Sequence, residues 1–499
     1  MKKLVFFIII FSLSKPLYSQ ESFFRYFPTS TFEVPKSAVE TPDDKYIIVG
    51  DYGLTYNDGY HGFILKLFSD GTIEDSRKFQ SKTHTSSFST IDHYSSSLTN
   101  YLITGYSDSI ADKDRYSKML LYRVNDSLQM VEEHCFPSEV NRCYKPWQTE
   151  IVDDSILYIL NTYYDYTLGR NSIQKLAVSK FRLPVDSIMS YHIEEGQNML
   201  CIAQDLIYLK DMHKLNILYF GNTISKSSAL NILELTDSLK YIRTLPGPER
   251  IFSNACATKY SDTSYLITGV ADGLIYPPKQ HILVYLMDNM DDTLKKLEYY
   301  NNPDTILYTG GKINTAISGN SIFVAGVYNI DPLHYPLQST PIWVQITRTD
   351  MGLNIISQHF YGGDPVYMPY SIISTSDDGA FITGFRWDYN TPYDLQFDVF
   401  VLKSDANGVI IDIPKNVTWQ ASEAILCPNP GSDYCIAVVG PQYCVPPLTL
   451  FDLNSKPVIA QDLYQSSTRI NTSSLAPGFY AYRFYSGQKL IGQGKWVKQ

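Results

Sequence analysis

The sequence DGAFITG at residues 378–384 decides the fold of this 499-residue chain, because similar segments recur along most of its length. The copies are DDKYIIVG (43–50), TNYLITG (99–105), DSILYILN (154–161), LNILYFG (215–221), TSYLITG (263–269) and NSIFVAG (320–326). Each copy ends on a Gly or Asn, which we call the anchor, and successive anchors are 55, 56, 60, 48, 57 and 58 residues apart. A repeat of this period indicates an array of similar structural units.

Further strand signals surround each anchor. In the first unit a polar loop follows the anchor and leads to an apolar run at Gly62–Leu67, and Ser69–Ile73 then supplies a turn. In the last unit an alternating apolar segment, Ser371–Ser374, precedes the anchor. Four antiparallel strands in about 50 residues are typical of one propeller blade. The sequence therefore predicts an all-β fold: a seven-bladed β-propeller of four-stranded antiparallel blades, followed by a small β-sandwich.

The N-terminal segment Glu21–Phe27 has the character of a strand and precedes the first unit, whereas the last unit ends with only a short segment at Val409–Ile413. We expect the N-terminal strand to complete or flank the outer strand of the seventh blade. That pairing would leave no long exposed sheet edge.

The loops that follow the anchors lie on one face of such a propeller and are rich in aromatic residues. Tyrosine and tryptophan combine a rigid apolar ring with a polar tip, which suits sugar rings and peptide side chains. The candidate ligand-binding residues are Tyr56, Tyr164, Tyr335, Trp387 and Tyr389. The alternative is that these rings pack the loops onto the propeller.

Charge and cysteine content narrow the functional classes. The formal net charge of −10 argues against a nucleic-acid partner, which requires a basic surface. The seven cysteines allow up to three disulfides in a secreted protein. Cys135 with Cys143 and Cys435 with Cys444 are close enough in sequence to pair, whereas a bond between residues 201 and 256 requires adjacent blades.

Catalytic and metal-binding templates are missing from the sequence. It contains no H-E-x-x-H, G-x-S-x-G, P-loop, G-x-G-x-x-G or C-x-x-C motif, and its nine histidines are scattered. We therefore predict no catalytic residue, no metal site and no cofactor, and we favour a binding protein over an enzyme.

The first 19 residues have the pattern of a secretory signal peptide. Lys2 and Lys3 precede the apolar run Leu4–Leu13, and Ser19 offers a small residue for cleavage before Gln20. The run is too short to span a bilayer, and no later stretch approaches 18 apolar residues. We expect no transmembrane segment in the mature chain.

The C-terminal segment carries four ordered blocks. A P-N-P-x-x-D opening at Pro428, Asn429, Pro430 and Asp433 is followed by LFDL at residues 450–453, an L-x-x-G-x-Y strand and a basic last strand. These blocks resemble the C-terminal sorting domain of Bacteroidetes type IX secretion cargo, except that the second block lacks its usual Gly. The other residues that carry the resemblance are Gly478 and Tyr480 in the third block and Lys495 and Lys498 in the last strand.

The resemblance implies export by the type IX secretion machinery, after passage through the periplasm, to the medium or the outer-membrane surface. The expected domains are a signal peptide (1–19), a β-propeller (20–415), a linker (416–426) and a sorting domain (427–499). The pattern Asp-Ser/Thr-aliphatic, as at residues 126–128 and 237–239, also resembles the O-glycosylation sequon of such proteins. It coincides with the expected turn between the third and fourth strands, where Asp and Ser favour local hydrogen bonds.

Three functions remain open at this stage. The first is a secreted or cell-surface binding protein that presents its aromatic loop face to a glycan or protein ligand. The second is an extracellular glycan hydrolase or lyase acting at the propeller axis, and the third is a structural or adhesive surface protein. The fold alone does not choose among them.

Overall fold

The computed structural model describes residues 22–29, 31–53, 60–79, 84–94, 99–109, 117–137, 142–165, 173–185, 188–194, 199–223, 229–271, 280–288, 290, 292–299, 307–330, 342–363, 365–388, 396–410, 419–420, 424–427, 433–439, 447–452, 456–463, 467–486 and 489–498. Within these ranges the elements are β-strands, apart from one 3₁₀ turn, η1 (Lys210–Met212). No helix in the described part of the chain has the length and apolar character needed to cross a membrane.

Antiparallel sheets of four strands follow one another in sequence order. The first is β2 (Phe32–Glu40), β3 (Tyr46–Gly53), β4 (His61–Leu67) and β5 (Ile73–Phe79). The second is β6 (His84–His93), β7 (Asn100–Ser109), β8 (Ser117–Asn125) and β9 (Met130–Pro137). The third is β10 (Arg142–Val152), β11 (Ile156–Asp165), β12 (Ile173–Arg182) and β13 (Ile188–Glu194).

The next sheets repeat this order. The fourth is β14 (Met199–Leu209), β15 (Lys214–Thr223), β16 (Ala229–Thr236) and β17 (Tyr241–Pro246). The fifth is β18 (Ile251–Ser261), β19 (Ser264–Ala271), β20 (His281–Asp288) and β21 (Thr293–Tyr299). The sixth is β22 (Leu307–Thr309), β23 (Thr315–Ser318), β24 (Ser321–Tyr328), β25 (Trp343–Asp350) and β26 (Ile355–Gly362), with β30 (Trp419–Gln420) paired to its outer edge.

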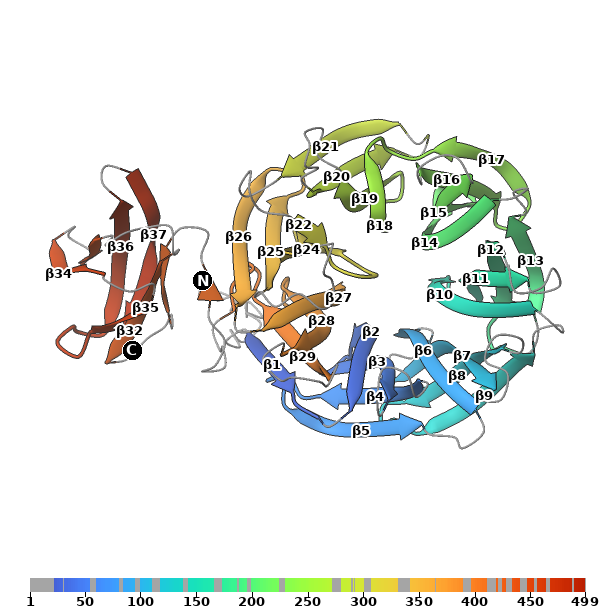
Figure 1. The fold of residues 1–499 in the computed structure, drawn as a ribbon, viewed down its shortest axis with the longest axis horizontal. Helices are drawn as coiled ribbons and strands as arrows, with labels where there is room; N and C mark the ends of the chain where they lie inside the picture. Colours follow the sequence, from blue (N-terminus) through green and yellow to red (C-terminus); the bar gives the residue numbers. More distant parts are fainter. Residues whose placement is uncertain are drawn as a thin grey trace, which may run out of the picture.

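The seventh sheet joins the two ends of the repeat region. It contains β27 (Val366–Ser374), β28 (Ala380–Trp387) and β29 (Phe397–Ser404), and β1 (Phe23–Phe27) is its outer strand. β1 pairs antiparallel with β29, from Phe23 opposite Lys403 to Phe27 opposite Val399. The expectation that the N-terminal strand completes the outer edge of the last unit is confirmed. Figure 1 shows the sheets arranged around a ring, with first strands innermost and fourth strands outermost, which is the arrangement of a β-propeller.

The second strand of each sheet provides the core between neighbouring sheets. Ile48, Ile103, Ile267, Phe323 and Ile382, which belong to the repeated segments, are each 0% exposed. Successive residues of a strand point to opposite faces of the sheet. Both faces are buried, because each sheet packs between two others.

A β-bulge in the first strand explains the anchors. The register of β2 against β3 shifts between Pro35 and Ser37, and β6, β10, β14, β18 and β27 have shifts at similar positions. The bulge pushes a backbone carbonyl against the second strand. A Cβ on Gly50 would lie 2.2 Å from Val34 O, and one on Gly105 would lie 2.1 Å from Ser87 O. Glycine is therefore required at these two positions, whereas the third sheet has Asn161 at the equivalent position.

The Asp-Ser-Leu tripeptides form the turns between third and fourth strands, as expected. Leu128 and Leu239 have φ angles of 55° and 61°, and the N–H of each donates to the carbonyl three residues earlier, at 2.9 Å in both turns. Their side chains are buried, whereas Ser127 and Ser238 are exposed. Burial of the leucine offsets the cost of the left-handed conformation.

Two of the disulfide pairings that the sequence left open are not formed. Cys135 is an exposed free thiol, so it does not pair with Cys143, and Cys256 is a buried free thiol, so it does not pair with Cys201. Proximity in sequence or on adjacent sheets is not enough, because a disulfide also needs Cβ atoms that face each other. Cys444 lies outside the described residues, so its suggested bond to Cys435 stays a prediction.

Two small sheets follow the ring in the sequence. One contains β31 (Ala424–Cys427), β32 (Tyr434–Val439) and β35 (Ser467–Asn471). The other contains β33 (Pro447–Phe451), β34 (Pro457–Asp462), β36 (Gly478–Ser486) and β37 (Lys489–Lys498). Side chains from both sheets form one hydrophobic cluster that includes Leu426, Ile470, Phe484 and the fully buried Trp496. The two sheets therefore share a core.

Candidate functional site

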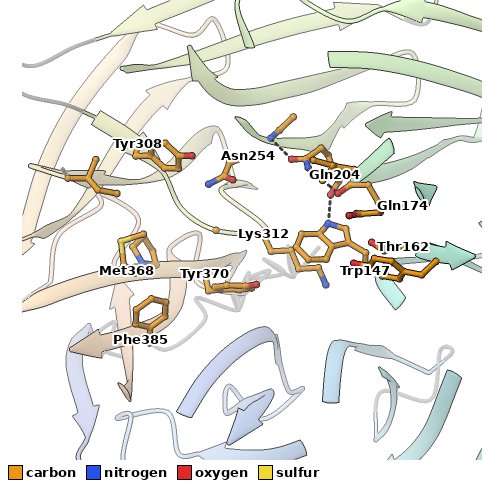
Figure 2. A pocket seen from close by; sticks show the side chains of 17 residues that line it. Trp147, Thr162, Gln174, Gln204, Asn254, Tyr308, Lys312, Met368, Tyr370 and Phe385 are labelled. Atoms are coloured by element: carbon orange, nitrogen blue, oxygen red, sulfur yellow. Dashed lines mark hydrogen bonds between the residues drawn. The ribbon is translucent and has the colours of Figure 1, made fainter. Parts of the chain in front are cut away.

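A cavity of about 510 Å³ lies among the first strands of the ring (Figure 2). Its walls come mainly from β10, β14, β18, β22 and β27, the first strands of five successive sheets. The lining side chains include Trp147, Thr162, Tyr164, Gln174, Gln204, Asn254, Tyr308, Lys312, Met368, Tyr370 and Phe385. Aromatic rings and amides thus line one space, which we call the axial cavity.

The β-bulges aim side chains into the axial cavity. Trp147, Gln204 and Tyr370 are the extra residues at the register shifts of β10, β14 and β27. Asn254 lies in the irregular part of β18 and has a φ of 48°. An extra residue in one strand bends that strand and redirects the side chain of the extra residue. Four sheets have such a residue on the cavity wall.

Trp147 is held by its neighbours on the fourth and fifth sheets. Its indole Nε1 donates to the Gln204 carbonyl at 2.7 Å, and the Gln204 side-chain oxygen accepts from the Ala255 N–H at 3.1 Å. These bonds are the dashed lines in Figure 2. The half-buried indole is therefore fixed in position with its ring on the cavity wall.

The opposite wall carries polar groups. The Asn254 side-chain amide donates to the Gly310 carbonyl at 3.3 Å, and the Tyr308 hydroxyl lies 2.6 Å from Ser253 Oγ. Both contacts join the fifth sheet to the sixth. They orient an amide and a phenol toward a space that they share with the aromatic wall.

Lys312 lies on the segment that separates β22 from β23, and its side chain extends alongside the Trp147 indole (Figure 2). The residue is 4% exposed, and Nζ donates to the Ser89 carbonyl of β6 at 2.8 Å. Nζ is 5.7 Å from the centre of the Trp147 ring. Burial, together with the Lys36 ammonium, lowers the pKa of Lys312 to about 7.

Three carboxyl groups on first strands, those of Asp92, Glu150 and Asp205, have raised pKa values. Burial raises the pKa of Asp92 and of Asp205 to about 6. Burial and the nearby charges of Asp92 and Asp205 raise the pKa of Glu150 to about 8. Asp92 accepts from Thr149 Oγ1 at 2.5 Å, and Asp205 accepts from two backbone N–H groups at 2.8 Å. These groups are not among the cavity-lining residues. No group of three metal-ligating side chains is found in the described ranges.

Two of the five predicted ligand residues, Tyr164 and Trp387, lie in the described part of the chain. Tyr164 lines the axial cavity, where its ring is 5.8 Å from Lys145 Nζ. Trp387 is 8% exposed and packs in a hydrophobic cluster with Phe385 and Phe397. That placement favours a packing role for Trp387. Tyr56, Tyr335 and Tyr389 lie outside the described residues, and their roles stay predictions.

The bulge residues were missed by sequence reasoning, although part of their signal is visible. Pro35, Pro146 and Pro369 each lie 15 residues before an anchor and directly before a bulge residue. Proline lacks the N–H that a regular inner pairing would use, so it is tolerated at a bulge. A search for Pro at this fixed offset would have identified Lys36, Trp147 and Tyr370.

The sorting-motif residues meet across the C-terminal sheets. Lys498 Nζ is 3.0 Å from Asp433 Oδ1, which joins the first block of the motif to the last. The Tyr480 hydroxyl donates to the Ala476 carbonyl at 2.8 Å, and Gly478 has a positive φ of 154°, which residues with a side chain rarely adopt. Residues 428–430 are outside the described ranges, and nothing is described of the Lys495 side chain.

No family model matches the chain, and no curated protein matches it. A fungal alcohol oxidase in complex with copper is similar at 8% identity and a TM-score of 0.43, covering 95% of this chain and 99% of that one. A Penicillium chrysogenum α-L-arabinanase in complex with arabinobiose has 9% identity and a TM-score of 0.39, with 66% and 98% covered. A polysaccharide lyase has 7% identity and a TM-score of 0.45, with 74% and 90% covered. Similarities this distant do not establish what this chain binds or whether it is an enzyme.

Proposed function

We propose that this chain is a secreted carbohydrate-binding protein that holds its ligand in the axial cavity. The observation that carries the proposal is the fixed Trp147 indole on the wall of a cavity also lined by amides and phenols. The volume of about 510 Å³ is within the usual range of ligand sites. A sugar ring offers an apolar face to an aromatic ring and hydroxyls to amides, so the two walls are complementary to it.

We infer that the seven sheets between Phe23 and Gln420 are the blades of a seven-bladed propeller. The pairing of β1 with β29 supports this, because it joins the two ends of the repeat in one sheet. We infer likewise that the two C-terminal sheets form a β-sandwich, and their shared core supports that assignment.

The C-terminal sandwich is proposed to be the type IX sorting domain, with residues 1–19 as the signal peptide. The contact between Asp433 and Lys498 supports the first part, because it gives two motif residues a common structural role. The mature protein is then exported from the periplasm to the cell surface or the medium. Its partners are the secretion machinery and a glycan ligand.

Binding is tested with the mature full-length protein on an array of glycans and peptides. Trp147→Ala is expected to weaken any glycan found by about thirtyfold, because loss of a central aromatic anchor costs about 2 kcal/mol or more. The matched control is Trp387→Phe, which alters a tryptophan that does not itself line the cavity and is expected to leave affinity unchanged. Peptide ligands without glycan ligands, or equal effects of both variants, would contradict the proposal.

An enzyme acting at the axis is the second candidate, and the three carboxyl groups favour it. Glu150 has a pKa of about 8 and Asp205 a pKa of about 6, so one is largely protonated and the other ionised at neutral pH. A proton donor and a proton acceptor are the requirements of general acid–base cleavage. Turnover of an array glycan that is lost in Glu150→Gln, with binding retained, would establish this candidate.

A further inference from the structure

The Lys312 amine is a buried hydrogen-bond donor with unused capacity. An ammonium group has three N–H donors, and the structure gives Nζ one acceptor, the Ser89 carbonyl at 2.8 Å. No carboxylate of the described residues forms an ion pair with it. A lysine that is 4% exposed, with one hydrogen-bond acceptor and the Trp147 ring centre 5.7 Å from Nζ, is costly to bury unless another group completes its hydrogen bonding.

The backbone fixes this amine in place. The Lys312 N–H donates to the Tyr370 carbonyl at 2.8 Å, and the Gly311 N–H donates to the Pro369 carbonyl at 2.8 Å. The segment is thereby attached to β27, and the side chain crosses from there to β6 on the second sheet.

The charged groups that face Lys312 already have other partners. On β2, Lys36 pairs with Asp51 at 2.5 Å and donates to Ser87 Oγ at 2.8 Å. On β6 and β14, Asp92 and Asp205 accept the hydrogen bonds from Thr149 and from backbone N–H groups described above. Burial raises the pKa of Glu150 on β10, and its electrostatic interaction with Asp92 and Asp205 raises this pKa further.

We propose that the axial cavity selects an anionic sugar, whose carboxylate or sulfate completes the bonding of Lys312 while its ring stacks on Trp147. This inference rests on the proposed function and names the ligand class of the same site. Both residues line the cavity, and Nζ lies 5.7 Å from the indole centre, so one sugar unit can contact both. A charge-assisted bond in a site shielded from water is stronger than a neutral one.

The proposal predicts a pH dependence with a definite sign. Lys312 has a lowered pKa, so the amine loses its charge in the empty cavity as the pH rises above about 7. An anion that pairs with the amine favours its charged form, so binding takes up a proton and affinity falls as pH rises from 7 to 9. Glu150 also gains negative charge in this range, which adds to the fall.

The experiment compares three matched probes by titration calorimetry at pH 6, 7, 8 and 9. They are a hexasaccharide of alternating glucuronate and N-acetylglucosamine, the same chain after carboxyl reduction, and the reduced chain after O-sulfation. The expected result at pH 6 is at least tenfold tighter binding of an anionic probe than of the reduced chain, decreasing toward pH 9. A preference for one anionic probe identifies the ligand's acid group.

Two variants test whether the preference for anionic probes depends on the Lys312 amine. Lys312→Met is expected to abolish the preference for anionic probes, so that the anionic probes and the reduced chain bind this variant within twofold of one another. Lys312→Arg is expected to keep the preference with a weaker pH dependence, because arginine stays charged and only the carboxyl groups of Asp92, Asp205 and Glu150 still titrate. If Lys312→Met does not fold, the wild-type pH profile and Lys312→Arg still provide the test.

Equal binding of all three probes would overturn this inference and leave the carbohydrate-binding proposal standing. Binding of none of them, together with an array free of glycan ligands, would overturn both. Tighter binding of a glutamate-rich peptide than of either anionic chain would overturn the inference in favour of an acidic protein ligand.

Discussion

Replacement of Gly384 by alanine tests why the repeat ends in glycine. A Cβ at this position would lie 2.1 Å from Met368 O and 2.7 Å from two carbons of the Phe400 ring. The first contact is with a backbone carbonyl in a bulge and the second with a fully buried ring, so neither can yield freely. Overpacking a core typically costs about 1–3 kcal/mol, and we expect about 3 kcal/mol here because backbone must move.

The assay is urea unfolding followed by tryptophan fluorescence, which gives the free energy of unfolding from the midpoint and slope. The matched control is Gly352→Ala in the turn between β25 and β26. Its new Cβ would meet only the polar ends of Asn354 and Asp350 side chains, at 3.2 Å, so a change below about 0.5 kcal/mol is expected. An effect of Gly384→Ala as small as that of the control would refute the explanation of the anchors.

Further predictions concern the core, a carboxyl group with a raised pKa, the thiols and export. Ile382→Asp should leave no cooperative unfolding transition by circular dichroism, because it places an unpaired charge in a fully buried position; a native-like transition would count against the assigned core. Burial raises the pKa of Asp92 from 3.8 to about 6, so its ionisation lowers stability as pH rises from 4 to 6. Asp92→Asn should therefore be about 1–2 kcal/mol more stable at pH 7 and show no such fall, and equal stability of both proteins at pH 7 would argue against it. A thiol reagent should label exposed Cys135 within minutes and buried Cys256 only on unfolding, as peptide mass spectrometry can show. Deletion of residues 421–499 should leave a folded protein in the periplasm. Normal surface display of the deletion variant would contradict the proposal that these residues contain the sorting domain.

Much of the ring was predictable because its signals are local. Short apolar runs that end in Gly or Asn at a fixed period predict second strands, and Ile103 and Ile382 are buried as expected. The N-terminal strand was predictable as well, since an unpartnered strand and an incomplete last unit imply each other. The Asp-Ser-Leu turns follow from side-chain chemistry within four residues.

The candidate site was less predictable because it depends on pairing between strands. A bulge is a property of two strands in register, so Gln204 and Asn254 carry no local signal that they face the axis. Lys312 and Ser89 are 223 positions apart in the sequence, and only closure of the ring brings them into hydrogen-bond contact. Attention to the loops after the anchors identified Tyr164, whereas most cavity residues come from strands before the anchors.

The most direct test of the carbohydrate-binding proposal is a crystal structure of the mature chain with the tightest-binding oligosaccharide from the array. We predict electron density for a sugar ring stacked on Trp147 inside the axial cavity, with an acidic group within hydrogen-bond distance of Lys312 Nζ. Density for the oligosaccharide at any other surface, with the axial cavity holding only water, would contradict the proposal.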